Sequence, residues 1–119
     1  MTPPLRIVIA DDEQDIRHGL HRLLAKLAYE VVGEASNGHE LLSCCRETTP
    51  DVVITDIRMP IMSGIEAANE LSKTHSIPII VVSAHERPQT QTECISDFLL
   101  KPVSLTSLQA AIIRACPQA

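Results

Sequence analysis

The stretch VVITDIRMP, residues 52–60, decides the fold that this sequence predicts. Three apolar residues and a threonine, all of them β-branched, lead to a single acid, Asp56, which Ile-Arg-Met-Pro follows. A short run of this kind is typical of a strand buried on both faces, as in parallel sheets covered by helices. Asp56 then has two interpretations. It ends a strand as a structural residue, or it stands at the open edge of a sheet to do chemistry.

Short apolar runs alternate with helical patterns along the whole chain. The expected strands cover residues 5–10, 30–36, 51–56, 77–83 and 97–100. After the first of them, Ile16, Leu20 and Leu24 recur at the spacing of an amphipathic helix. Ser63 and Ser104 stand where each would cap the start of a later helix. Strands separated by helices predict an α/β fold with a doubly wound, five-stranded parallel sheet and helices on both faces.

Composition narrows the class of protein. A chain of 119 residues suits one domain, so we expect a single domain over residues 1–119 without a separate effector domain. The net charge of −5 argues against direct binding of nucleic acid, because no basic stripe is present to neutralise phosphates. The sequence shows neither a signal peptide nor a membrane-spanning run, and its four cysteines lack a metal-binding spacing. We therefore expect a cytoplasmic protein with free thiols.

Five polar residues follow four of the expected strands. They are Asp11 and Asp12 after the first strand, Asp56 after the third, Ser83 after the fourth and Lys101 after the fifth. In open α/β sheets, ligands bind outside the carboxyl ends of the strands, where the strand order reverses. If the order is 2-1-3-4-5, the first and third strands are neighbours and the three acids converge.

Converging carboxylates repel one another unless a cation joins them. An all-oxygen site of two or three carboxylates suits Mg²⁺ with retained waters. Lys101 can pair with the acids or hold a phosphoryl oxygen, and Ser83 offers a hydroxyl to the same oxygen. Such a set neutralises a transferring phosphoryl group from several sides.

Each of these residues also has a structural interpretation. Asp11 and Asp12 would cap the first helix and complement its dipole. Asp56 would end a strand, Ser83 would begin a loop, and Lys101 would be a surface charge. Each structural role is the more common one for a single residue. Because all five stand together at the ends of four strands, we interpret them as a functional site.

The chain resembles the receiver domain of two-component response regulators over essentially its whole length. The segments that carry the resemblance are IVIADDE (7–13), DVVITDIRMPIMSG (51–64), IPIIVVSA (77–84) and DFLLKP (97–102). The resemblance implies a flavodoxin-like fold with strand order 2-1-3-4-5. It also implies a signalling domain rather than an enzyme, which assists the transfer of phosphate to its own acid and the hydrolysis that follows.

By this resemblance, Asp56 is the phosphoacceptor and takes a phosphoryl group from a sensor histidine kinase or a histidine phosphotransfer protein. Asp12, Asp56 and the backbone carbonyl of Arg58 would ligate Mg²⁺ (or Mn²⁺) directly, with Asp11 acting through water. Ser83 and Lys101 would hold the phosphoryl oxygens.

The resemblance also implies a conformational switch made of Ser83 and Phe98, and a cis peptide bond at Lys101-Pro102. The output partner or effector domain would lie outside this chain, or would be a second copy of it in a phosphorylation-linked homodimer. The kinase and the output pathway cannot be named from the sequence.

One segment departs from the family pattern. Only 17 residues separate Ser83 from Lys101, about one helical turn (roughly four residues) fewer than in relatives. About Pro88 to Ser96 remain for a fourth helix, which we expect to be short or irregular because its threonines are poor helix formers. We therefore expect output to depend more on the last helix and on Phe98.

Two rival functions stay open at this point. A haloacid-dehalogenase-like phosphatase also uses an aspartate on a doubly wound sheet, but it carries its nucleophile in an early DxDx[TV] motif. Here the early acids are adjacent, in DDE (11–13). A phosphate-independent docking module of the same fold is the other rival. The altered segment before the fifth strand keeps it open, whereas the presence of all five site residues argues against it.

Overall fold

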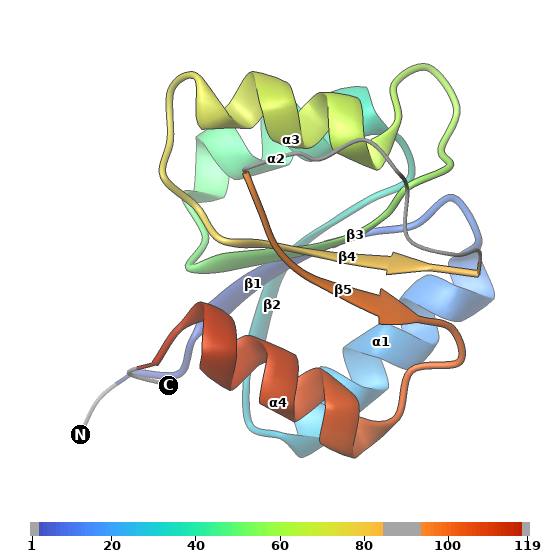
Figure 1. Ribbon diagram of the computed structural model, residues 1–119, viewed down its shortest axis with the longest axis vertical. Coiled ribbons are helices and arrows are strands. Elements are labelled where there is room, and N and C mark those ends of the chain that lie inside the picture. Colours follow the sequence, from blue (N-terminus) through green and yellow to red (C-terminus); the bar gives the residue numbers. More distant parts are fainter. Residues whose placement is uncertain (1–2, 85–93, 118–119) are drawn as a thin grey trace.

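The computed structural model describes residues 3–84 and 94–117, and these form one five-stranded parallel sheet with four helices (Figure 1). The strands are β1 (Arg6–Ala10), β2 (Glu30–Ala35), β3 (Val52–Asp56), β4 (Ile79–Ser83) and β5 (Ile95–Leu100). The helices are α1 (Gln14–Lys26), α2 (Gly38–Thr48), α3 (Gly64–Ser72) and α4 (Leu105–Ala115). The strand order is β2-β1-β3-β4-β5, which confirms the predicted doubly wound sheet.

The helices cover both faces of the sheet. Helices α2 and α3 lie on one face, and α1 and α4 lie on the other (Figure 1). Every residue of β3 and β4 is buried, as their apolar sequences predict. Alternate residues of β3 serve the two cores: Val53 packs towards α2 and α3, and Val52 and Ile54 pack towards α1 and α4.

Polar side chains begin three of the helices. Both predicted caps are confirmed, because Ser63 accepts from the backbone N–H of Glu66 at 3.1 Å and Ser104 accepts from that of Ser107 at 3.1 Å. Glu66 also bonds back to the N–H of Ser63, which completes a capping box. Asn37 is the N-cap of α2, and its side chain accepts from the N–H of Glu40 at 2.8 Å. Caps at these positions fix where each helix leaves the carboxyl edge of the sheet.

The fifth strand begins earlier than predicted. The sequence suggested residues 97–100, whereas β5 starts at Ile95, which pairs with Ile79 of β4. Ile95 also packs against the core under α2 and α3, so burial and pairing both favour the extended conformation there. The expected fourth helix therefore cannot include Ile95 and Ser96. The rest of its range, residues 88–93, lies outside the described residues.

Candidate phosphoacceptor site

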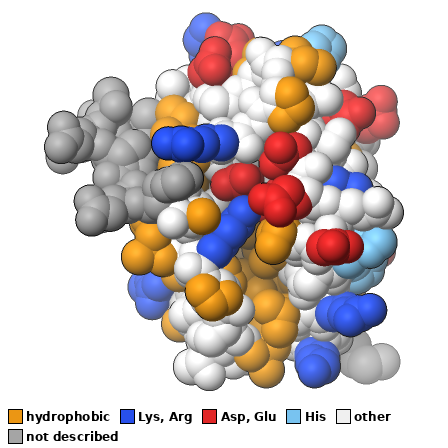
Figure 2. Space-filling model, turned by 90° about the vertical axis from the view of Figure 1, so that its right-hand side faces the viewer, with side chains coloured by type: hydrophobic (Ala, Val, Ile, Leu, Met, Phe, Trp, Pro, Cys, Tyr) orange, Lys and Arg blue, Asp and Glu red, His pale blue; other side chains and the backbone are white. Residues whose placement is uncertain are grey.

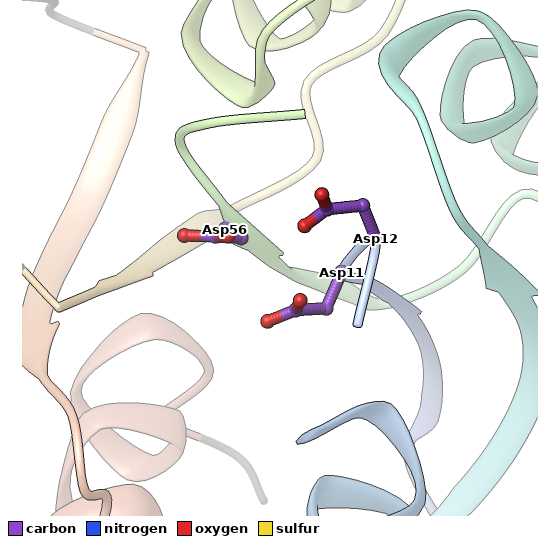
Figure 3. A group of neighbouring side chains, drawn as sticks. All are labelled: Asp11, Asp12 and Asp56. Atoms are coloured by element: carbon purple, nitrogen blue, oxygen red, sulfur yellow. The ribbon is translucent and has the colours of Figure 1, made fainter. Parts of the chain in front are cut away.

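Adjacent strands bring three acids together at the carboxyl edge of the sheet. Strands β1 and β3 pair in register, with Ala10 opposite Thr55, so the residues that follow them are neighbours. One carboxylate oxygen from each of Asp11, Asp12 and Asp56 lies within 4.8 Å of the others. Their side chains project to the same side beyond the strand ends (Figure 3). The geometry therefore creates one compact anionic centre.

The three acids differ in burial. The side chains of Asp11 and Asp56 are buried, whereas Asp12 is exposed. Lys101 bridges the two buried acids, with its Nζ atom 2.8 Å from Asp11 Oδ2 and 3.5 Å from Asp56 Oδ2. The other oxygen of Asp56 accepts from the backbone N–H of Ile57 at 2.8 Å. One ammonium thus balances part of the negative charge.

The surroundings of Asp56 raise its pKa. Burial is the main reason why the pKa of Asp56 is raised, and the nearby Asp11 carboxylate raises it further. Lys101 and the bond from Ile57 lower the pKa but do not cancel the effect of burial. Burial alone would lower the pKa of Lys101, yet its pairs with Asp11 and Asp56 outweigh burial, so that pKa is raised. Lys101 therefore keeps its positive charge, whereas the surroundings of Asp56 disfavour the ionised form of that acid.

A small cleft opens over Asp56. It has a volume of about 200 Å³ and is lined by Asp12, Glu13, Asp56, Arg58, Ala84 and Lys101. Figure 2 views this edge and shows acidic side chains gathered at its middle, with a basic side chain and hydrophobic side chains beside them. The cleft is large enough for a tetrahedral oxyanion, and it opens to solvent above the Asp56 carboxylate.

A larger apolar groove adjoins the cleft and shares Lys101 with it. The groove has a volume of about 860 Å³ and runs between α1 and the loop from Lys101 to Val103. Ile16, Gly19 and Leu23 of α1 are among its lining residues. We call this feature the α1 groove. A partner seated in it would stand next to the acids.

Ser83 and Arg58 lie at the same edge, whereas Phe98 lies further back in β5, opposite Val81 of β4. Ser83 is buried at the end of β4, and its carbonyl accepts from the N–H of Lys101 at 2.8 Å. Phe98 is partly buried against the core under α2 and α3. Arg58 is exposed and lines the cleft. The Lys101-Pro102 peptide bond is cis.

The structural interpretation of the early acids does not hold as stated. Helix α1 has Glu13 as its N-cap residue, and no side chain caps it. Asp11 instead uses one oxygen to accept from the N–H of Glu13 at 2.9 Å and the other to pair with Lys101. The carboxylates of Asp11 and Asp12 are thus directed towards the shared centre with Asp56 rather than towards the helix end.

The sequence did not reveal the residues that contact the backbone carbonyls of Asp56 and Asp11. A side-chain carbon on Gly64 would collide with the carbonyl oxygen of Asp56, so only glycine lets α3 begin this close to Asp56. Thr55 donates its hydroxyl to the same carbonyl at 2.9 Å. Arg17 of α1 donates to the carbonyl of Asp11 at 2.8 Å. A glycine eight residues after the acid was the one visible signal.

The donor set suits a hard divalent cation. All three side chains offer carboxylate oxygens, the ligands that Mg²⁺ and Mn²⁺ prefer, and Asp12 leaves the centre open to solvent. The two buried acids beside a third also gain from added positive charge, because Lys101 alone does not bring the pKa of Asp56 down to its ordinary value. The residues present therefore fit such an ion.

The fold and the acidic centre together define a doubly wound α/β domain of the flavodoxin-like class with a carboxylate site at its carboxyl edge. The chain belongs to the response regulator receiver domain family, whose model matches residues 7–113.

Known proteins agree with this assignment. The chain is 40% identical over 102 residues to the chemotaxis protein CheY of Thermotoga maritima, covering 82% of this chain and 85% of that protein. It is 36% identical over 113 residues to the transcriptional regulatory protein PdtaR of Mycobacterium tuberculosis, covering 92% of this chain. The chain spans only 55% of the length of PdtaR.

Solved structures give the same result for the fold. The receiver domain of the putative response regulator NarL from Mycobacterium tuberculosis superposes with a TM-score of 0.86 at 30% identity, covering 94% of this chain and 95% of that one. Among the described residues, no helix combines the length and the apolar character needed to cross a membrane.

Proposed function

We propose that this chain accepts a phosphoryl group on Asp56 from a phosphohistidine donor, in a reaction that needs a divalent cation, and thereby controls an output partner. The observation that carries the proposal is the placement of Asp56 in an open cleft between Lys101 and the acids Asp11 and Asp12. A structural strand end needs neither the cleft nor the bridging lysine.

The transfer exchanges one bond to phosphorus for another. A carboxylate oxygen of Asp56 attacks phosphorus, the bond from phosphorus to the donor imidazole nitrogen breaks, and the imidazole leaves with that electron pair. Lys101 stabilises the phosphoryl oxygens as they approach, and the hydroxyl of Ser83 donates to one of them. Later attack of water on phosphorus would release phosphate and restore Asp56. The chain thus assists its own phosphorylation and dephosphorylation but turns over no outside substrate.

Asp12, Asp56 and the backbone carbonyl of Arg58 would hold Mg²⁺ or Mn²⁺ directly, with Asp11 acting through water. The ion would neutralise charge between the phosphoryl oxygens and the acids, where approach is otherwise repulsive. The protein residues supply the rest: Asp56 is the nucleophile, Lys101 fixes the phosphoryl group, and the cleft leaves one face open to the donor.

The direct test is labelling with a small donor. Incubation with an acyl phosphate or a phosphoramidate should add one phosphoryl group to the wild type, measured by intact mass, and chelation of divalent cations should prevent it. Asp56→Asn should abolish labelling because the amide is not a nucleophile for phosphorus, and Lys101→Ala should slow labelling more than it weakens cation binding.

Two results would decide against the proposal. Undiminished labelling of Asp56→Asn would show that another residue is the acceptor. Continuous release of phosphate from a general phosphatase substrate would favour a phosphatase, whereas labelling that stops at one phosphate favours a receiver. Asp51→Asn is a matched control, since this exposed acid lies before β3 and does not line the cleft.

The partner that donates the phosphoryl group would be a sensor histidine kinase or a histidine phosphotransfer protein. Such a protein must present a phosphohistidine over Asp56, and the α1 groove adjoins the cleft through Lys101. We propose that the donor protein occupies this groove. The four free thiols among the described residues suit a reducing cytoplasm, where we place the reaction.

The switch would consist of Ser83 and Phe98. Val81 of β4 pairs with Phe98 of β5, and Ser83 pairs with Leu100, so a shift of the hydroxyl towards a phosphoryl group would reach β5 through this pairing. Phe98 is only partly buried against the core, and we propose that it turns further inward when Ser83 shifts. An output partner, an effector domain or a second copy of the chain would then detect the change on the surface of β5 and α4.

A further inference from the structure

Arg17 connects helix α1 to strand β2 and to Asp11, the residue that follows β1. From α1, its Nη1 atom donates to the backbone carbonyl of Asp11 at 2.8 Å, and its Nε atom donates to Glu34 of β2 at 3.1 Å. The other oxygen of Glu34 lies 3.0 Å from Nδ1 of His21, one turn further along α1. The Arg17 side chain is partly buried, with 18% of its surface exposed.

The contact completes the anchoring of Asp11. The N–H of Asp11 donates to the carbonyl of Ala35 at 3.0 Å, and its carboxylate binds the N–H of Glu13 and the ammonium of Lys101. The carbonyl of Asp11 is the start of the peptide unit that leads to Asp12. Because Asp12 is exposed, its position depends on this peptide unit and on the anchored N–H of Glu13.

We infer that Arg17, held by Glu34, is a positioning residue that orients Asp12 for cation binding. The inference rests on the proposed function and names the part of the chain that fixes the exposed ligand. A planar guanidinium can hold a carbonyl and a carboxylate at once in a fixed geometry, whereas the ammonium of lysine acts as a point charge on a flexible stem.

A purely Coulombic role and a positioning role of Arg17 predict opposite effects of its loss on cation affinity. A guanidinium near the acids repels an incoming cation, so loss of its charge alone should tighten cation binding. Loss of positioning should weaken it. Groups that orient metal ligands typically contribute 10–100-fold in metal affinity, and we expect the low end, about tenfold, because Arg17 acts through the backbone.

The experiment is calorimetric titration of the unphosphorylated chain with Mg²⁺ and with Mn²⁺. Arg17→Gln should raise the Kd about tenfold, and Arg17→Lys should also raise it although the charge is kept. Arg46→Gln is the matched control, because it removes the same charge from an exposed site at the end of α2. It should leave the Kd unchanged or slightly lower.

A second measurement detects the anchoring itself. Amide hydrogen exchange at Asp12 and Glu13 should accelerate in Arg17→Gln and in Glu34→Gln, while amides of β3 exchange as in the wild type. Glu34→Gln also covers the case in which Arg17→Gln folds poorly. A Kd that is unchanged or lower in both Arg17 variants would overturn the inference. A wild type that binds no cation and accepts no phosphoryl group would instead overturn the proposed function.

Discussion

Asp56 stands where its own ionisation is unfavourable. Burial raises the pKa of this carboxyl, the neighbouring Asp11 raises it further, and Lys101 compensates only in part. An acid whose pKa is raised in the folded state lowers stability once the pH exceeds the pKa that the acid has in the unfolded chain. The loss is complete above the folded-state pKa. Asp56 therefore weakens the fold at neutral pH, as groups at functional sites often do.

Asp56→Asn should consequently stabilise the chain in the absence of divalent cations. The amide oxygen can still accept from the N–H of Ile57, and Lys101 keeps its pair with Asp11 at 2.8 Å. We expect a gain in the free energy of unfolding of roughly 0.5–2 kcal/mol at pH 7. The gain should shrink as the pH falls towards about 4, the ordinary pKa of the carboxyl, because Asp56 is then protonated.

Urea unfolding of both proteins between these pH values measures the difference. The raised pKa of Lys101 affects stability only at alkaline pH, because the contribution of its ion pairs is lost as the pH rises through that pKa. A difference between the two proteins that stayed constant with pH would show that folding does not raise the pKa of Asp56. A less stable Asn variant would show that the pair with Lys101 outweighs burial at Asp56.

Helix α1 ends in a motif that normally contains glycine. Leu27 is the C-cap residue, and Ala28 follows with a φ of 64°, in the left-handed region. The N–H of Ala28 donates to Ala25 and that of Tyr29 donates to Leu24, both at 3.0 Å, which is the Schellman pattern. The left-handed conformation costs an L-residue roughly 1–2 kcal/mol. The end of α1 thus carries strain that its hydrogen bonds and the packing of Tyr29 maintain.

Ala28→Gly should therefore stabilise the chain, by up to about 1 kcal/mol after the greater flexibility of glycine in the unfolded state is subtracted. Ala25→Gly is the matched control, because Ala25 is exposed in the helical part of α1. The same chemical change there should destabilise by about 0.8–1 kcal/mol. Thermal unfolding of the two variants measures both signs, and a loss of stability in both would contradict the account of the motif.

At the scale of the whole molecule, the sheet separates the α1 groove from the face that carries α2 and α3. The α1 groove lies on the face covered by α1 and α4, next to the acids, whereas α2 lies on the opposite face (Figure 1). A small donor needs only the cleft over Asp56, but a donor protein must also cover part of the surface around it. Transfer from a protein should therefore depend on the groove in a way that labelling by a small molecule does not.

Gly19→Arg tests this dependence. Gly19 is exposed, a Cβ placed on it would meet no atom within 4 Å, and arginine favours the helix more than glycine. The variant should fold and label normally with a small donor, while transfer from a phosphohistidine protein should slow at least about tenfold, as expected from a clash within an interface.

Ser43→Arg, on the exposed part of α2, adds the same side chain to the other face and is the control. It should change neither rate. Equal slowing by Gly19→Arg and Ser43→Arg would mean that added charge, rather than the α1 groove, determines transfer. Normal transfer to Gly19→Arg would place the donor elsewhere.

The sequence by itself determined the fold class, because periodicity depends only on local spacing. Runs such as residues 52–56 and 79–83 are apolar on both faces, and they predict a covered parallel sheet whatever the partners. The acids after β1 and β3 could be placed at one edge for the same reason, since parallel strands all end on the same side. Ser63 and Ser104 were recognisable as caps because a cap acts on its own helix.

Tertiary structure decided what depends on residues far apart in the chain. The start of β5 follows from pairing of Ile95 with Ile79 and from burial, neither of which has a local signature. The raised pKa of Asp56 depends on how deeply the fold buries it. The contact of Arg17 with Asp11 and Glu34 joins α1, β1 and β2, and no sequence spacing announces it. Burial and long-range contact energies arise only once the chain has packed.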